Sequence, residues 1–309
     1  MVEQRTISPL KSLILLLFLA LSGAVVFGMI AVFIGLWATG TPLGNLEEML
    51  SGNASNVGFL KIVQGGSSIG MFVLPALVLG PAERHRYRYL DFNAKVNPSL
   101  WFMVVAVMFF STPVFEQAIK LNEQMRLPDV FAGLESWMKV KEAEQERLTN
   151  LLLSETTYTG LITSLLVVAV IAAIGEEFLF RGCVQGILTR WFKNPHLAIW
   201  ATAVIFSAIH LQFYGFLPRM LLGALFGYLL CWGKNIWLPV LAHFMNNAFA
   251  TISAFYLKRQ GRSLDELNFS QQIPDYLYFL SFVVTAVLLY QYYKTTTSQK
   301  IRNNGKTLG

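Results

Sequence analysis

Long apolar stretches recur along almost the whole of this sequence, and they constrain the fold more than any other feature. A transmembrane helix needs about 20 mostly apolar residues to cross a hydrocarbon core about 30 Å thick. Stretches of this kind lie at residues 11–37, 57–79, 100–119, 158–180, 197–211, 216–232, 236–256 and 276–292. A composition of 54% hydrophobic and 14% charged residues also lies outside the balance of soluble domains. The sequence therefore predicts an all-α, polytopic transmembrane helical bundle with about eight spans.

The charges in the loops predict how this bundle is oriented, because short cytoplasmic loops are enriched in lysine and arginine. Basic residues gather before the first stretch and in alternate loops: Arg5, Lys11, Arg84, Arg86, Arg88, Lys95, Arg190, Lys193, Lys234, Lys294, Lys300, Arg302 and Lys306. The other loops hold most of the acids: Glu47, Glu48, Glu123, Asp129, Glu135, Glu142, Glu144 and Glu146. We expect both termini in the cytoplasm and the chain in the bacterial inner membrane, in contact with lipid. The scattered net charge of +6 offers no basic groove for nucleic acid.

The chain divides into four regions. Residues 1–120 hold the N-terminal transmembrane helices, 121–156 an extramembrane arm, 157–256 the core with the chemistry, and 257–309 the last transmembrane helix with a polar tail. The first helix is expected to be retained, since no small-residue cleavage site precedes Trp37. In the arm, apolar residues at helical spacing precede a charged stretch at 139–147, which suits either a helix on the outer membrane surface or a solvated arm. We expect disorder after Lys294.

Ionisable residues inside the predicted spans are the candidates for function, because a charge within a transmembrane helix costs about 2.5 to 3.5 kcal/mol on insertion scales. The fourth apolar stretch leads into Glu176, Glu177 and Arg181, the fifth ends near His210, and the seventh holds His243 and Asn247. Cys183 and Cys231 are too few for a disulfide framework and are expected to be buried thiols.

Helical spacing divides these residues into pairs. Glu177 and Arg181 are four residues apart with the acid first, which favours an ion pair within the helix. That pair leaves Glu176, about 100° away around the helix, free to face a catalytic centre. His243 and Asn247 share a face by the same spacing. If the fourth helix turns at residues 193–195, Glu176 and His210 lie about 24 Å and 21 Å from that turn and are level on antiparallel helices.

In these three motifs the chain resembles the CAAX protease and bacteriocin-processing family, also called type II CAAX endopeptidases. The family pattern E-E-x-x-x-R is met by Glu176, Glu177 and Arg181, and F-x-x-x-H by Phe206 and His210. The pattern H-x-x-x-N is met by His243 and Asn247. The motifs cover about residues 158–256 and stand in the family's order. The resemblance identifies residues 157–256 as the catalytic core.

The resemblance implies an intramembrane endopeptidase that cleaves a membrane-associated or prenylated peptide. In it Glu176 and His210 activate a water, while His243 and Asn247 complete a metal sphere or stabilise the oxyanion. We expect a divalent metal, zinc, bound by Glu176, His210, His243 and Asn247. A metal would lower the pKa of a bound water, whereas without one Glu176 could act as a general base. Both mechanisms remain open at this stage, and Glu177 and Arg181 have supporting roles.

Other functions are open to the same residues. A non-proteolytic membrane scaffold or bacteriocin-immunity protein could bind a partner peptide in the same cavity, and paired intramembrane acids also suit a proton-coupled transporter. No H-E-x-x-H motif occurs, which disfavours a zincin-like protease. The G-x-S-x-G pattern at residues 66–70 lies within an apolar helix and is interpreted as helix packing, as are the glycine pairs at 182/186 and 223/227.

Overall fold

The structure, a computed structural model, describes residues 7–50, 56–84, 87–92, 96–262 and 274–306. It is all-helical over these residues, and a helix covers each of the eight predicted stretches. The predicted class of fold is confirmed. In chain order the main helices are α1 (Pro9–Thr39), α3 (Val57–Ser68) with α4 (Leu74–Ala82), α5 (Pro98–Glu123), α6 (Ala132–Leu152), α7 (Tyr158–Ser164) to α9 (Gln185–Phe192), α10 (Pro195–Ala208), α11 (Phe216–Gly233), α12 (Trp237–Arg259) and α13 (Asp275–Lys306).

Six of the helical rods are long and apolar enough to cross a membrane: α1, α3–α4, α5, α7–α9, α11 and α13. The prediction of eight spans is therefore approximate. At 14 residues, α10 is shorter than a full span. In α12 the polar residues His243, Asn246 and Asn247 lower the mean hydropathy of an otherwise apolar helix.

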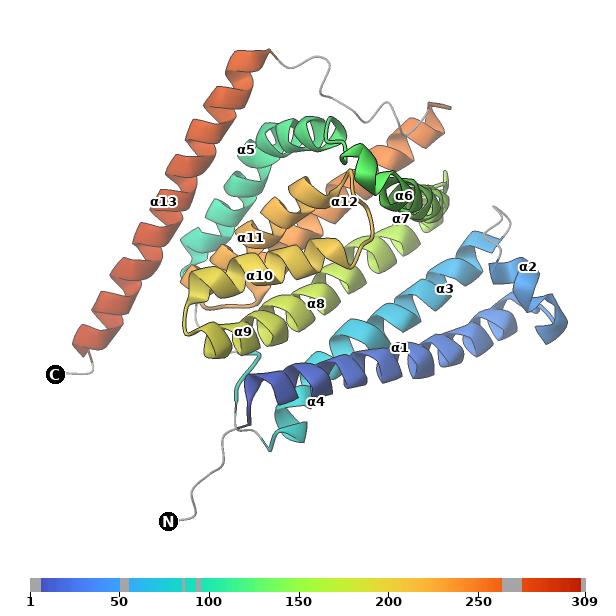
Figure 1. Ribbon diagram of the computed structural model, residues 1–309, viewed down its shortest axis with the longest axis horizontal. Helices are drawn as coiled ribbons and strands as arrows, with labels where there is room; N and C mark the ends of the chain where they lie inside the picture. The colour runs from blue at the N-terminus through green and yellow to red at the C-terminus, as the bar shows by residue number, and fades with distance from the viewer. Residues whose placement is uncertain (1–6, 51–55, 85–86, 93–95, 263–273, 307–309) are drawn as a thin grey trace.

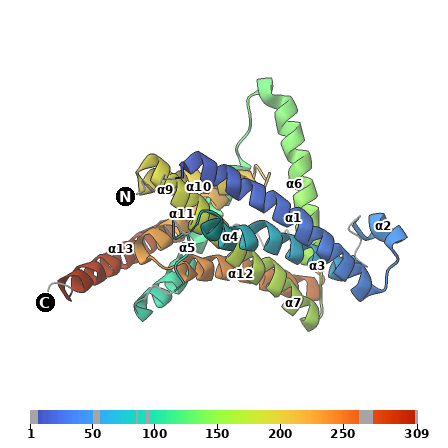
Figure 2. The ribbon, with the colours of Figure 1, turned by 90° about the horizontal axis from the view of Figure 1, so that it is seen from below.

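The helices run roughly along one direction, so the bundle has two ends (Figure 1). α1 begins and α13 finishes at the same end, which is also where α9 passes into α10. Figure 2, turned by 90°, shows α9, α10 and the end of α13 at this end again, with α2 (Leu46–Leu50) and α6 at the other. The predicted placement of both termini on one side agrees with this arrangement. Arg5, Arg86 and Lys95, three of the basic residues on which the predicted orientation rests, lie outside the described residues.

The turn between α9 and α10 forms where the sequence predicts it. Lys193 adopts the left-handed conformation with φ of 52° and ends α9. The side chain of Asn194 then accepts hydrogen bonds from the backbone N–H groups of His196 and Leu197, and Pro195 occupies the first turn of α10. An asparagine cap followed by proline is a common way to start a helix.

α1 and the rod α3–α4 pack closely because small residues face each other. A side chain on Gly70 would collide with the backbone of Gly23, and one on Gly66 would meet Ala31. Between Ser68 and α4 the rod passes through a π-helical segment, η3 (Ile69–Val73), which contains Gly70. The interpretation of the G-x-S-x-G pattern as packing is confirmed.

The arm is helical, as predicted, and α6 projects away from the other helices (Figure 2). Apolar side chains of the arm remain exposed, both just before α6 and within it: Val130, Phe131, Leu134, Trp137 and Val140. The prediction of disorder after Lys294 is wrong, because α13 continues to Lys306. No proline interrupts this segment, so it can continue the helix that the apolar part of α13 begins.

Candidate active site

The helix that carries Glu176 is a continuous rod of 35 residues in which helix type changes along its length. A π-helical segment, η5 (Leu165–Ile171), precedes α8 (Ala172–Glu176), and a second, η6 (Glu177–Val184), follows it. Glu176 and Glu177 therefore stand at the boundary between α and π geometry. Each π segment loosens the regular hydrogen-bond ladder and changes which residues share a face, and such segments are frequent at functional sites. Sequence spacing alone does not reveal this change.

Glu177 bridges two partners in the interior. Its Oε1 accepts a hydrogen bond from Arg181 Nη1 at 2.8 Å, and the same oxygen lies 2.8 Å from His243 Nδ1. Both side chains of the Glu177–Arg181 pair are fully buried. The predicted ion pair is present, and it extends to a helix 66 residues further along the chain. We call Glu176, Glu177, Arg181 and His243 the polar seam.

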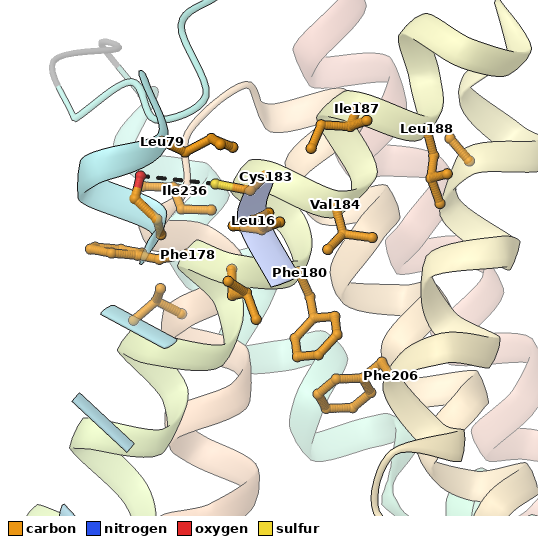
Figure 3. Packing of buried hydrophobic residues seen from close by; sticks show 14 residues of the cluster. Leu16, Leu79, Phe178, Phe180, Cys183, Val184, Ile187, Leu188, Phe206 and Ile236 are labelled. Atoms are coloured by element: carbon orange, nitrogen blue, oxygen red, sulfur yellow. Dashed lines mark hydrogen bonds between the residues drawn. The ribbon is translucent and has the colours of Figure 1, made fainter. Parts of the chain in front are cut away.

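Arg181 is held on several sides. Its Nη2 donates to the carbonyl oxygen of Gly223 in α11 at 3.1 Å, and its Cζ lies 4.5 Å from the ring centroid of Phe206. Phe206 packs edge-on against Phe180, as Figure 3 shows. Hydrogen bonds and an aromatic face together offset part of the cost of burying a guanidinium group. Phe206 thus belongs to the buried core beside the polar seam.

The contact between Glu176 and His243 defines the reactive side of the polar seam. His243 Nε2 lies 3.8 Å from Glu176 Oε2, too far for a direct hydrogen bond. Because Nδ1 faces a carboxylate, which only accepts hydrogen bonds, Nδ1 carries the proton of the neutral ring and Nε2 is left bare. A basic nitrogen and a carboxylate thus face each other across a gap in which one water can contact both.

His210 is oriented in the same manner. Its Nδ1 lies 2.7 Å from the carbonyl oxygen of Phe206, so in the neutral ring Nδ1 carries the proton and Nε2 is bare. The prediction that His210 lies within a helix is wrong, because α10 ends at Ala208. Leu211, with φ of 54°, turns the chain out of the helix just after His210. The imidazole packs against Phe206 at 5.1 Å, and His243 packs against the same ring at 6.1 Å.

The loop that carries His210 is tied to a neighbouring helix. Buried Asn122 of α5 donates from its Nδ2 to the carbonyl oxygen of Phe213 at 2.9 Å and accepts a hydrogen bond from the backbone N–H of Leu217. The hydroxyl of Ser207 donates to the carbonyl oxygen of Phe216 at 2.7 Å. These bonds tie the connection between α10 and α11 to α5 and to the end of α10.

Both polar atoms of the Asn247 side chain form hydrogen bonds within the protein. Its Nδ2 donates to the carbonyl oxygen of Val168 in η5 at 2.9 Å, and its Oδ1 accepts from Asn246 Nδ2 at 3.1 Å. Asn247 therefore ties α12 to the π-helical segment η5. Its part in a metal sphere or oxyanion site stays a prediction.

Arg219 in α11 is a site residue that the sequence analysis missed. Its charge acts on both Glu176 and His210, and its Nη2 donates to Gln212 Oε1. Its Nη1 is buried and has no hydrogen-bond partner. The signal was present, because Arg219 is a charge inside a predicted span, the criterion that selected Glu176.

The arm reaches the same loop from outside. Glu142 Oε2 accepts a hydrogen bond from the backbone N–H of Tyr214 at 3.2 Å, and the Tyr214 hydroxyl lies 3.4 Å from Glu135 Oε1. Desolvation at this contact raises the pKa of Glu142 above its ordinary value, against the hydrogen bond from Tyr214. The loop with His210 thus lies between the polar seam and α6.

The predicted metal site contains donor atoms of the kinds that zinc prefers. The bare Nε2 atoms of His210 and His243 and the carboxylate of Glu176 are suitable ligands, and each Nδ1 is held by an acceptor, as is common for metal-ligating histidines. Among the described residues, however, no three His, Cys, Asp or Glu side chains lie close enough to hold one ion. The donors fit zinc in chemistry, and binding would require them to close on the ion.

These features define a membrane protein with a carboxylate and two oriented imidazoles inside its helical bundle, and comparison with known families points to the same class. Residues 158–249 match the family described as type II CAAX prenyl endopeptidase Rce1-like. The resemblance drawn from the three motifs is thereby confirmed for this region. The match includes Glu176, His210, His243 and Asn247 and excludes α1 to α6 and α13.

Two proteins of Bacillus subtilis (strain 168) are similar to part of the chain. One, named "Putative membrane peptidase YdiL", is 30% identical over 105 residues, which are 32% of this chain and 43% of that protein. The other, "Uncharacterized protein YpbD", is 28% identical over 91 residues, 28% of this chain and 43% of that protein. The chain thus spans less than half the length of these relatives. No solved structure matches.

Proposed function

We propose that this protein is an intramembrane endopeptidase in which Glu176 activates a water molecule for attack on a peptide bond. The observation that carries the proposal is the gap between Glu176 Oε2 and the bare Nε2 of His243, with His243 fixed from behind by Glu177. The match of residues 158–249 to a peptidase family supports the same reaction.

In the proposed reaction, a water in this gap donates one hydrogen bond to Glu176 and another to His243 Nε2. Glu176 takes a proton as the water oxygen attacks the peptide carbonyl, and the proton then passes to the leaving amine. Glu177 keeps its hydrogen bond to His243 Nδ1, which fixes the ring and stabilises any positive charge that develops on it. General acid–base catalysis of this kind contributes about 10²- to 10⁴-fold to a rate.

Arg219 is proposed to stabilise the oxyanion. The two imidazoles present bare nitrogens and cannot donate from Nε2 while neutral, so another donor is needed for the developing negative charge. The unpartnered Nη1 of Arg219, whose charge already acts on Glu176 and His210, can supply it.

Zinc remains part of the proposal as an expected cofactor. Glu176, His210 and His243 would hold it, and when bound it would supply a water of lowered pKa. The steps above use only the protein's own side chains.

The proposed substrate is a membrane-associated or prenylated peptide, and the proposed location is the bacterial inner membrane. The substrate class follows from the family match, whose description names CAAX prenyl endopeptidases, and from the burial of the polar seam inside the bundle. Peptidase activity separates this proposal from a scaffold or immunity protein, which would bind a peptide without cleaving it.

The test is cleavage of candidate membrane-associated peptides, including a prenylated CAAX peptide, by the purified protein in lipid. Glu176→Gln and His210→Ala are each expected to lower the rate by about 10²- to 10⁴-fold. His196→Ala is the matched control, because His196 contacts Tyr228 near the start of α10 and should leave the rate unchanged. Wild-type protein that cleaves no faster than both site variants would overturn the proposal. Peptide binding that survives in those variants would then support the scaffold.

A further inference from the structure

A cavity of about 500 Å³ lies at the end of the bundle where α9 passes into α10 and α12 begins. Glu176, His210 and His243 do not line it, whereas Arg181 does. Its wall also includes Tyr87 and Tyr89 from the connection between α4 and α5. The cavity is therefore separate from the reactive gap and lies on the far side of Arg181.

The charged residues on the wall of this cavity are mainly cationic. Arg88, Arg181, Arg190 and Lys234 line it, with Asp91 as the acidic residue. Arg88 forms an ion pair with Asp91 at 2.9 Å. Glu177, which does not line the cavity, neutralises the charge of Arg181. Lys234 has no side-chain hydrogen bond or ion pair with any described residue, and its positive charge is left over.

Two of the arginines that line this cavity also carry buried N–H groups without acceptors. Arg181 Nε and both Nε and Nη1 of Arg190 are buried without a hydrogen-bond partner, and the side chain of Arg181 is completely buried. Arg190 lies flat on Tyr87, with its Cζ 3.4 Å from the ring centroid, and uses Nη2 for Ser12 and Tyr89. A guanidinium group cannot lose its proton, so donors of this kind are costly unless an acceptor reaches them.

We propose that this cavity binds a phosphate group. Three arginine N–H groups and an ammonium group exceed what a single carboxylate satisfies, whereas a phosphate presents several acceptor oxygens, and arginine is especially suited to it. The volume exceeds that of a bare phosphate and has room for the adjoining part of a larger molecule. The cavity lies at the ends of membrane-spanning helices, where lipid headgroups are found, so the phosphate can come from a phospholipid headgroup or from solution.

The site is independent of peptide hydrolysis, since it shares no reacting atom with the polar seam. Arg181 nevertheless connects the two, because it lines the cavity while its Nη1 bonds Glu177.

The test is thermal unfolding of the purified full-length protein in a neutral detergent. Two probes are titrated separately, inorganic phosphate at low concentration and a short-chain phosphatidic acid, and a short-chain diacylglycerol serves as the probe without phosphate. The unfolding midpoint is expected to rise with a phosphate-bearing probe and to stay constant with diacylglycerol. A rise with both phosphate probes assigns the site to the phosphate alone, and a rise with phosphatidic acid only assigns it to a lipid headgroup.

Two lysines provide a matched pair of variants. Lys234 and Lys193 both end helices in the left-handed conformation, with φ of 57° and 52°, but only Lys234 lines the cavity. Asparagine tolerates this conformation, so Lys234→Asn and Lys193→Asn should both fold. Lys234→Asn is expected to weaken phosphate binding about tenfold, and Lys193→Asn to change it less than about twofold.

Arg88→Gln gives a second, exposed variant on the cavity wall and is expected to weaken binding as well. The proposal is overturned if neither phosphate probe shifts the midpoint, if diacylglycerol shifts it as much as phosphatidic acid, or if Lys234→Asn binds as well as Lys193→Asn.

Discussion

The contact between α1 and the rod α3–α4 differs in kind from the contact of η6 with α12. The first is made by glycines whose backbones approach so closely that Gly70 has no room for a side chain. The second is made by buried charges, with Glu177 joining Arg181 to His243 through one oxygen. Small-residue packing needs only shape, whereas the polar seam needs every partner present. The comparison teaches that two contacts of the bundle are held in different ways, one by close approach of backbones and the other by paired buried charges. The rod α3–α4 also buries a charge, but Lys61 pairs with Glu155 and not with α1.

The largest effect is expected from removing Glu177. Glu177→Ala leaves buried Arg181 without its carboxylate and His243 without its anchor, and breaking a buried pair costs about 3–5 kcal/mol. The free energy of unfolding should fall by that amount. The control is Glu177→Leu combined with Arg181→Leu, which removes both charges and should cost less. If the free energy of unfolding fell equally in the single and the double variant, the pairing of charges would not be what stabilises the polar seam.

Arg219→Gln tests whether the polar seam extends to the residue that sequence analysis missed. Loss of one oxyanion donor costs about 10²- to 10³-fold in kcat. We expect that loss with KM little changed, measured in the peptide cleavage assay. Lys193→Arg, which keeps a charge away from the site, is the control. A normal kcat in Arg219→Gln would remove Arg219 from the site.

Gly70→Ala tests the other side of the comparison. Its new Cβ meets the backbone and side chain of α1, and forcing extra atoms into a packed contact costs about 1–3 kcal/mol. Gly58→Ala on the same rod meets nothing within 4 Å and should be neutral or stabilising. The unfolding free energy should separate the two variants, while the rate per folded molecule stays at the wild-type value in both. Equal stabilities would mean that α1 and η3 do not pack as described.

The smallest effect concerns the contact of α6 with the loop that carries His210. The folded protein raises the pKa of Glu142 above that of the unfolded chain, so between these two values the folded state binds more protons. Docking of α6 is therefore strongest at low pH and weakens as pH rises through the raised pKa. Limited proteolysis of α6 should be faster at higher pH in the wild type and lose this pH dependence in Glu142→Gln. Glu144→Gln, on the same helix, should keep it.

Much of this architecture follows from the sequence. Apolar stretches predict the eight helices, and Lys193, Asn194 and Pro195 predict the turn that ends the rod with Glu176. The four-residue spacing of Glu177 and Arg181 predicts their ion pair, and the three motifs with their order carry the family resemblance. Each of these features depends on local spacing or on short motifs, and both are visible in a single sequence.

Other features depend on tertiary contacts that spacing does not encode. The π-helical segments around Glu176 change the direction in which its side chain points. The hydrogen bond between Glu177 and His243 joins two helices that are distant in sequence. His210 leaves its helix because Leu211 turns the chain. The helical tail was missed because polar composition was interpreted as disorder, and its threonine, asparagine and glycine residues give no helix signal of their own. Arg219 was overlooked despite its visible charge.

Peptide cleavage in water labelled with ¹⁸O tests the central claim most directly, that Glu176 activates water in the gap beside His243. After a single turnover, mass spectrometry of the products should find one ¹⁸O in the new carboxyl group for the wild type. Glu176→Gln should give about 10²- to 10⁴-fold less labelled product in the same time. Labelled product that forms equally fast in Glu176→Gln would contradict the account.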